Sequence, residues 1–135
     1  MEPTYENIRD FMDRYFKALG PYTRAPETID KMRDYYAPGF KISHPSEEQD
    51  IESFLNMYRQ GGFGETLTPK QVIIDDKQMR VGAHIQSTFN KHGTGELLRE
   101  FEMLVQYLLV VDEGNNIKVK EIFFVVIPGT EKFFV

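Results

Sequence analysis

The fold is decided by a short stretch with the sequence FKISHP, at residues 40–45. Its apolar and polar positions alternate, so Phe40, Ile42 and His44 would share one face of a short strand that ends at Pro45. Helical patterns lie on both sides of this stretch, and the chain beyond residue 64 reads almost entirely as strands. Helices followed by antiparallel strands indicate an α+β domain. We expect a curved sheet wrapped around the helices, with a pocket between them.

The first helical segment covers residues 4–19. We expect Thr4 to cap its N-terminus and Gly20-Pro21 to end it. Apolar side chains recur at alternating steps of three and one residues, which places them on one face of a helix. These side chains are Ile8, Phe11, Met12, Tyr15, Phe16 and Leu19.

Two further helices are expected at residues 26–36 and 46–59. Pro26 suits the first position of the earlier one. Ser46 and Gln49 have the spacing of a capping box, so the later helix should begin at Ser46. Both segments repeat apolar side chains on one face, as helices that cover a sheet do.

Four strands are expected after the helices, at residues 67–74, 79–90, 97–111 and 117–127. Short polar and glycine-containing turns join them, so consecutive strands should pair antiparallel. The segment 97–111 is too long to be flat, and we expect a bulge and strong curvature in it. The chain has 135 residues, which suits one domain and not two.

Composition excludes several classes of function. The net charge is −5, from 16 basic and 21 acidic side chains, and no basic stripe is present, so nucleic acid is not an expected partner. There is no cysteine, which removes disulfides and thiolate chemistry. The polar N-terminal residues 1–4 do not have the pattern of a secretory signal. No run approaches the roughly 20 apolar residues that span a bilayer. We therefore expect a cytoplasmic protein with no membrane partner.

The long strand 97–111 also predicts an interface. One of its faces is apolar, and the other mixes Leu104 and Leu108 with Glu102 and Gln106. A sheet face that is half apolar is usually covered by something. A homodimer through the outer sheet face is the simplest cover.

The order of these elements resembles the nuclear-transport-factor-2-like superfamily, over essentially the whole chain. The short motifs resemble its SnoaL-like and steroid delta-isomerase branch: RYFKAL at residues 14–19 is similar to the first-helix motif of the isomerases, and FKISHP is similar to their short strand. The resemblance implies a cone-shaped roll. It also implies a pocket for a small hydrophobic ligand.

The resemblance assigns roles to particular residues. In the isomerases a first-helix tyrosine donates a hydrogen bond to a substrate oxyanion, which places that role on Tyr15. Their general base is an aspartate before a proline, and His44 stands at that position. Tyr107 stands where they carry a second oxyanion donor. The SnoaL-like cyclases use an acidic residue deep in the cone, and Glu121 is the acidic residue on the last strand.

Other residues leave alternatives open. His84 alternates with Gln86 and Thr88 on one face of its strand; composition places this face in water, whereas the resemblance places it in the cavity beside His44. Tyr36 and Tyr58 have core spacing, and their hydroxyls could reach a ligand. Phe40 would line the pocket beside His44, and Met12 beside Tyr15. The histidines lack the spacing of metal ligands, so no metal and no cofactor is expected.

Two functions fit this sequence. The first is a cofactor-independent enzyme that moves a proton next to a carbonyl, giving isomerisation, cyclisation or dehydration of a hydrophobic oxygenated molecule. His44 would be the base and Tyr15 the donor to the enolate oxygen. The second is a non-catalytic ligand-binding or dimeric interaction module of the same fold.

Overall fold

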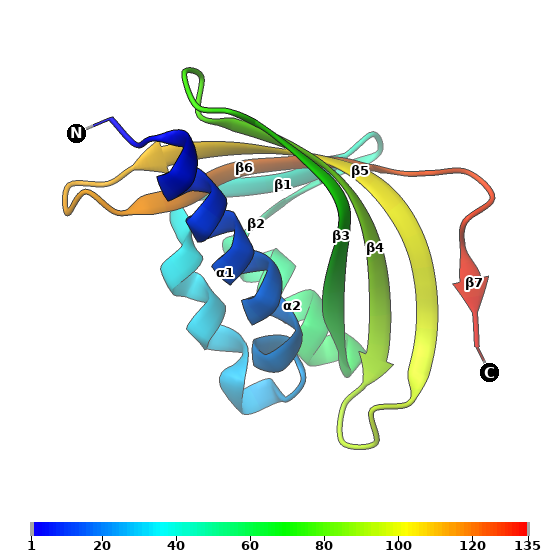
Figure 1. Ribbon diagram of the computed structural model, residues 1–135. Coiled ribbons are helices and arrows are strands. Elements are labelled where there is room, and N and C mark those ends of the chain that lie inside the picture. The colour runs from blue at the N-terminus through cyan, green and yellow to red at the C-terminus, as the bar shows by residue number, and fades with distance from the viewer. Residues whose placement is uncertain (1, 135) are drawn as a thin grey trace.

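The computed structural model describes residues 2–134, so Met1 of the polar N-terminal stretch lies outside the described residues. Three helices lie inside the bend of one strongly curved sheet (Figure 1). Within the described range, no helix is both long and apolar enough to cross a membrane. The elements are α1 (Tyr5–Thr23), the 3₁₀ helix η1 (Pro26–Tyr35), β1 (Tyr36–His44), β2 (Glu47–Asp50), α2 (Ile51–Gly61), β3 (Phe63–Asp75), β4 (Arg80–Lys91), β5 (Leu97–Val111), β6 (Ile117–Val126) and β7 (Lys132–Phe133).

The sheet has the strand order β2-β1-β6-β5-β4-β3, and the short β7 pairs with β5. All neighbours pair antiparallel except β1 and β6, which are parallel. The predicted α+β roll with a curved, mostly antiparallel sheet is therefore confirmed. The predicted irregularity in the long strand is confirmed too, because the register of β5 with β6 shifts between Leu108 and Leu109.

Helix α1 begins as predicted and ends later. The Thr4 hydroxyl accepts a hydrogen bond from the Asn7 amide, and Asn7 bonds back to the Thr4 amide. The helix continues through Pro21 to Thr23, although proline lacks the amide that a helix interior needs. Tertiary contact overrides this local signal: Gly20 packs so closely that an added Cβ would lie 2.9 Å from Thr66 Oγ1.

The predicted start of the third helix, at residue 46, is wrong. Residues 47–50 form β2, which pairs with β1 in a tight hairpin, and the helix begins only at Ile51. Asp50 is the N-cap, since its Oδ1 accepts the Ser53 amide at 2.8 Å. The capping box at Ser46 is therefore absent, because Ser46 lies in the hairpin turn and its hydroxyl contacts His44. The strand expected at 40–44 is correspondingly longer and begins at Tyr36.

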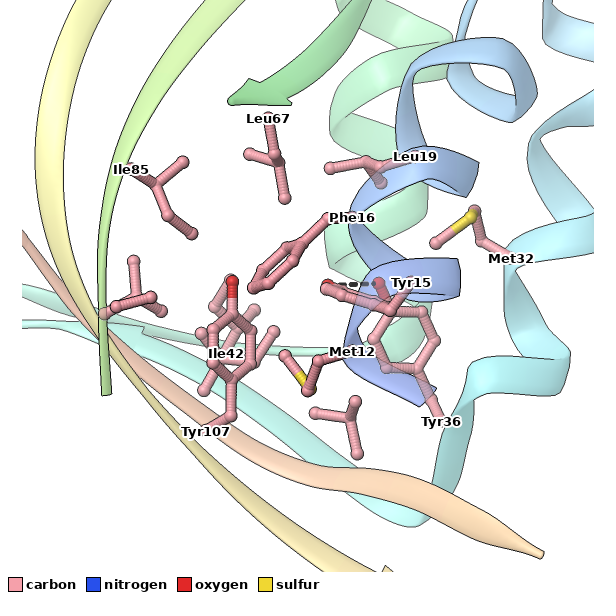
Figure 2. Packing of buried hydrophobic residues seen from close by; sticks show 14 of the residues in the cluster. Met12, Tyr15, Phe16, Leu19, Met32, Tyr36, Ile42, Leu67, Ile85 and Tyr107 are labelled. Atoms are coloured by element: carbon pink, nitrogen blue, oxygen red, sulfur yellow. Dashed lines mark hydrogen bonds between the residues drawn. The ribbon is translucent and has the colours of Figure 1, made fainter. Parts of the chain in front are cut away.

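The core lies between the helices and the concave face of the sheet (Figure 2). The predicted apolar stripe of α1 is buried as a whole. Figure 2 shows Tyr107 and Ile85 of the sheet facing Phe16 and Tyr15 of α1. The pattern of β5 alternates as expected, with buried residues at Phe101, Met103, Val105, Tyr107 and Leu109.

Candidate active site

A cavity of about 450 Å³ opens between the helices and the inner face of the sheet. Its wall is mostly aromatic and aliphatic and comes from α1, α2 and strands β1 to β6. Sites for small molecules typically have about 300–1,000 Å³ and a few polar groups in an apolar wall. The polar side chains of this wall therefore decide what the cavity can do.

Glu65, near the start of β3, is the buried acid of this cavity. It lines the wall and is only 7 % exposed. The Tyr58 hydroxyl donates to its Oε1 at 2.5 Å, and the Ser87 hydroxyl donates to its Oε2. Burial raises the pKa of the Glu65 carboxyl, and this effect exceeds the opposing effect of the two hydroxyl donors. The cavity thus contains a carboxyl group that holds its proton to higher pH than an exposed one.

The end of α1 positions Glu65. The Glu65 amide donates to Thr23 Oγ1 at 2.9 Å, while the Thr23 hydroxyl donates to the Leu19 carbonyl at 2.6 Å. Gly64 allows this approach, because an added Cβ there would lie 2.8 Å from the Thr23 carbonyl oxygen. The junction of α1 and β3 therefore fixes the backbone from which the carboxyl projects.

Sequence reasoning missed Glu65. The strand was expected to begin at residue 67, and the observed β3 begins at Phe63, so the acid fell into an unassigned connection. The alternation of side chains along a strand could have found it, because Glu65 and the buried Leu67 are two residues apart and share a face. Ser87 lies on the face of β4 opposite His84, and the sequence left open whether that face points inward; the structure buries it there.

Two tyrosines, Tyr15 and Tyr107, line the cavity, and Tyr36 lies behind Tyr15. The hydroxyls of Tyr15 and Tyr36 are 3.0 Å apart and hydrogen bonded, as the dashed line in Figure 2 shows. The Tyr15 ring packs edge-on against Tyr107 with centroids 5.7 Å apart. Burial raises the pKa values of Tyr15, Tyr36, Tyr58 and Tyr107. These phenols therefore stay protonated and serve as hydrogen-bond donors.

His44 and Tyr15 both line the cavity, at different depths. Tyr15 is 1 % exposed, whereas the His44 side chain is 33 % exposed. Its Nδ1 lies 3.1 Å from Ser46 Oγ, and its Nε2 lies 3.4 Å from a Glu47 carboxylate oxygen. Between the imidazole and the Tyr15 phenol no direct hydrogen bond is found in residues 2–134. The imidazole therefore sits at the rim and the phenol in the interior.

The remaining predicted site residues divide into three groups. Tyr107 lines the cavity, and Tyr58 reaches it through Glu65. Met12 and Phe40 are each 1 % exposed and belong to the packed core, as does the Tyr36 ring. Glu121 is exposed on β6, so it is not the acid inside the cone.

The alternative that places His84 in the cavity is wrong. His84 Nε2 lies 2.7 Å from Glu102 Oε1, and Lys70 contacts the same carboxylate at 3.1 Å. Its neighbours Ala83 and Ile85 are buried against the helices, so the pleat turns His84 to the outer face. The interpretation from composition is confirmed, and His44 has no histidine partner in the cavity wall that the structure describes.

Arg99 is the second charged group that the sequence did not single out. It lies on β5 and lines the cavity beside Phe101. Its positive charge lowers the pKa of the Glu65 carboxyl, against the larger effect of burial. In residues 2–134, no group of three His, Asp or Glu side chains is arranged to hold a metal ion.

Comparison with solved structures identifies the fold. An epoxide hydrolase/cyclase-like enzyme, SalBIII, with a role in pyran ring formation in the polyether salinomycin, matches with a TM-score of 0.69 and 9 % identity, over 96 % of this chain and 97 % of that one. An ntf2-like protein with a cystatin-like fold from Novosphingobium aromaticivorans also matches, with a TM-score of 0.61 and 12 % identity, over 93 % of this chain and 82 % of that one. This chain has the nuclear-transport-factor-2-like fold. The resemblance inferred from the sequence is thus confirmed at the level of the fold.

Other solved structures match equally broadly. A ketosteroid isomerase-like protein from Erwinia carotovora atroseptica has a TM-score of 0.61 and 12 % identity, over 90 % of this chain and 95 % of that one. The pinacolase BvnE from Penicillium brevicompactum has a TM-score of 0.64 and 14 % identity, over 92 % and 88 %. No protein-family model matches the sequence, and no curated protein matches it. At these identities the likeness concerns the fold alone.

Proposed function

We propose that this protein is an enzyme that binds a small hydrophobic, oxygenated molecule in the cavity and moves a proton on it. The observation that carries the proposal is the Glu65 carboxyl, buried in an apolar wall and held by Tyr58 and Ser87. A carboxyl group whose pKa is raised by burial is suited to accept and return a proton near neutral pH. Such groups concentrate at functional sites.

The reaction that fits these groups is proton transfer next to a carbonyl. The Glu65 carboxylate would take the proton from the carbon beside the carbonyl, and the electron pair of that C–H bond would move into an enolate. Buried phenols, Tyr107 first and Tyr15 beside it, would donate hydrogen bonds to the enolate oxygen. Return of the proton to another carbon gives isomerisation. Breaking the C–O bond of a β-hydroxyl group in the enolate, with the proton on Glu65 passing to that oxygen so that water leaves, gives dehydration.

His44 keeps a role in this proposal as a second acid–base group. Its imidazole lines the rim of the same cavity, and an imidazole can act as a proton donor or acceptor. It would exchange protons between the ligand and solvent, whereas Glu65 acts in the interior. The structurally similar proteins include a cyclase-like enzyme, an isomerase-like protein and a pinacolase, which supports a reaction of this kind without selecting one.

A screen of hydrophobic ketones and epoxides tests the proposal. Compounds that raise the melting temperature of the protein are incubated with it, and conversion is followed by liquid chromatography and mass spectrometry. We expect His44→Ala and Tyr15→Phe to keep ligand affinity within about threefold and to lower turnover by about tenfold or more. Tyr35→Phe, on a partly exposed tyrosine that does not line the cavity, is the control. A ligand that binds and is never converted contradicts catalysis.

A specific observation favours the alternative, a ligand-binding or dimeric module. The hydroxyl of Tyr15 and the ring of His44 are both held by protein partners, and large apolar side chains lie exposed on the outer sheet face. Leu104 on β5 is 51 % exposed and Phe123 on β6 is 47 % exposed. The register of these two strands places both side chains on the same face. We propose that a second copy of this chain covers them.

The dimer is tested by substitution at the centre of this face. Leu104→Glu should weaken self-association by about tenfold or more, because a buried charge without a partner is costly at an interface. Tyr5→Glu, at a comparably exposed position on α1 and not on the outer face of β5 and β6, should leave association unchanged. Sedimentation velocity over a range of protein concentrations measures both. A wild-type protein that stays monomeric at every concentration would rule the dimer out.

A further inference from the structure

Arg99 is placed in the cavity by the pleat of β5. It lies two and four residues before the buried Phe101 and Met103 and shares their face of the strand, so its side chain leaves the strand on the concave face. The guanidinium carbon lies 4.4 Å from the centroid of the Phe101 ring and 5.5 Å from that of Phe89. Aromatic faces orient a guanidinium group by cation–π contact and leave its N–H edge free for other partners.

Arg99 is the one permanently cationic side chain among the described residues that line the cavity. The other ionisable groups in the wall are His44, Glu47, Glu65 and the two phenols Tyr15 and Tyr107. An arginine stays charged at every physiological pH. The cavity therefore has one fixed positive charge in a mostly apolar wall, which proton transfer by Glu65 does not require.

The guanidinium of Arg99 is incompletely paired. Its Nη2 donates to Glu131 Oε1 at 2.8 Å, by one contact only. Its Nε is buried and has no hydrogen-bond partner in the part of the chain that the structure describes. A buried donor without a partner is unfavourable, and a planar anion that accepts from two N–H groups would satisfy it.

Glu131 is a partner that a ligand can displace. Its side chain is 38 % exposed, and it precedes β7, which pairs with β5 through only two residue pairs. Figure 1 shows β7 at the edge of the sheet next to the C-terminus, where it pairs with the start of β5. Ion pairs with this degree of exposure contribute little to stability, whereas a bidentate carboxylate inside an apolar wall interacts strongly.

We propose that Arg99 binds a carboxylate group of the ligand, with Glu131 as the counter-ion that this carboxylate replaces. The ligand is then a hydrophobic acid, whose apolar body fills the cavity and whose anionic end meets the N–H edge of Arg99. This inference rests on the proposed binding function of the cavity and adds the substrate class. Arg99 is a binding residue in this scheme, and Glu65 remains the group that moves the proton.

Two matched pairs of probes test the inference: 2-naphthoate with 2-naphthamide, and 4-phenylbutanoate with 4-phenylbutanamide. Isothermal titration should show that the wild-type protein binds each acid about tenfold or more tightly than its amide. Arg99→Met should remove this preference by weakening the acid alone, and Arg99→Lys should restore part of it. Glu131→Gln should tighten binding of the acid, because the competing carboxylate is gone.

The control is Arg80→Met, which removes the same charge from an exposed position on β4 and should leave both affinities unchanged. A merely structural role for Arg99 would make Glu131→Gln destabilising without any gain for the acid. If the wild-type protein binds amides as tightly as acids, the inference is overturned and the cavity proposal stands. If none of the four probes binds, both are overturned.

Discussion

Replacing Glu65 by glutamine should lower kcat by about 10²- to 10⁴-fold, the range that loss of a general acid–base group produces. Glutamine keeps the shape of the side chain and one oxygen that accepts from Tyr58 or Ser87, but it cannot exchange a proton. Glu121→Gln removes an exposed carboxyl from β6 and is the matched control, with turnover expected to be unchanged. Full activity of Glu65→Gln on a converted substrate would exclude Glu65 as the proton-transfer group.

The same substitution has a signature that requires no substrate. Burial raises the pKa of Glu65 in the folded state above its value in the unfolded chain. The folded protein therefore binds the proton more tightly, and stability is lost as pH rises from the unfolded pKa to the folded pKa. Below this window wild type and Glu65→Gln should be about equally stable. Above it the variant should be the more stable, by about 1.4 kcal/mol for each unit of pKa shift.

Urea unfolding between pH 4 and 8 measures this difference. Glu121→Gln, which removes an exposed carboxyl from β6, is the matched control for the loss of one acidic side chain. Parallel curves for wild type and Glu65→Gln would mean that the buried carboxyl titrates normally. That result would remove the basis for using Glu65 as an acid–base group near neutral pH.

The elements whose signal is local could be predicted from the sequence. The stripe of α1 and the alternation of β5 each depend on one face of one element, and the structure buries both. The β2 hairpin was missed, because Ser46 and Asp50 are both good capping residues and only pairing with β1 selects Asp50. A local pattern does not distinguish two caps four residues apart.

The site depends on contacts that no local pattern contains. Glu65 is an acid beside a glycine in the sequence, and its burial comes from Thr23 and Ser87, which are 42 and 22 residues away. His84 shows the opposite case: the resemblance suggested the cavity, and the polar composition of its face suggested water. The structure places it outside, so the composition of the strand face was the better guide.

Replacing Thr23 by valine should destabilise the fold by about 1–3 kcal/mol, the cost of leaving a buried donor unpaired. Thr23 is fully buried, and its hydroxyl accepts the Glu65 amide at 2.9 Å. Valine has nearly the same shape and volume but offers no acceptor. The main-chain carbonyl of Thr23 still accepts a hydrogen bond from His92 Nε2 at 2.7 Å. The loss of stability should therefore come from the side-chain hydrogen bond alone.

Thr23→Ser separates the hydrogen bond from packing. It keeps the hydroxyl and loses one methyl group, which should cost about 1 kcal/mol or less. Urea unfolding ranks the two variants, and hydrogen exchange of the Glu65 amide should quicken in Thr23→Val and stay slow in Thr23→Ser. Because this bond fixes the backbone that carries the Glu65 carboxyl, turnover should fall in the same order. If valine proves no worse than serine in both measurements, the end of α1 does not hold the acid in place, and the β3–β4 pairing around Ser87 must do so alone.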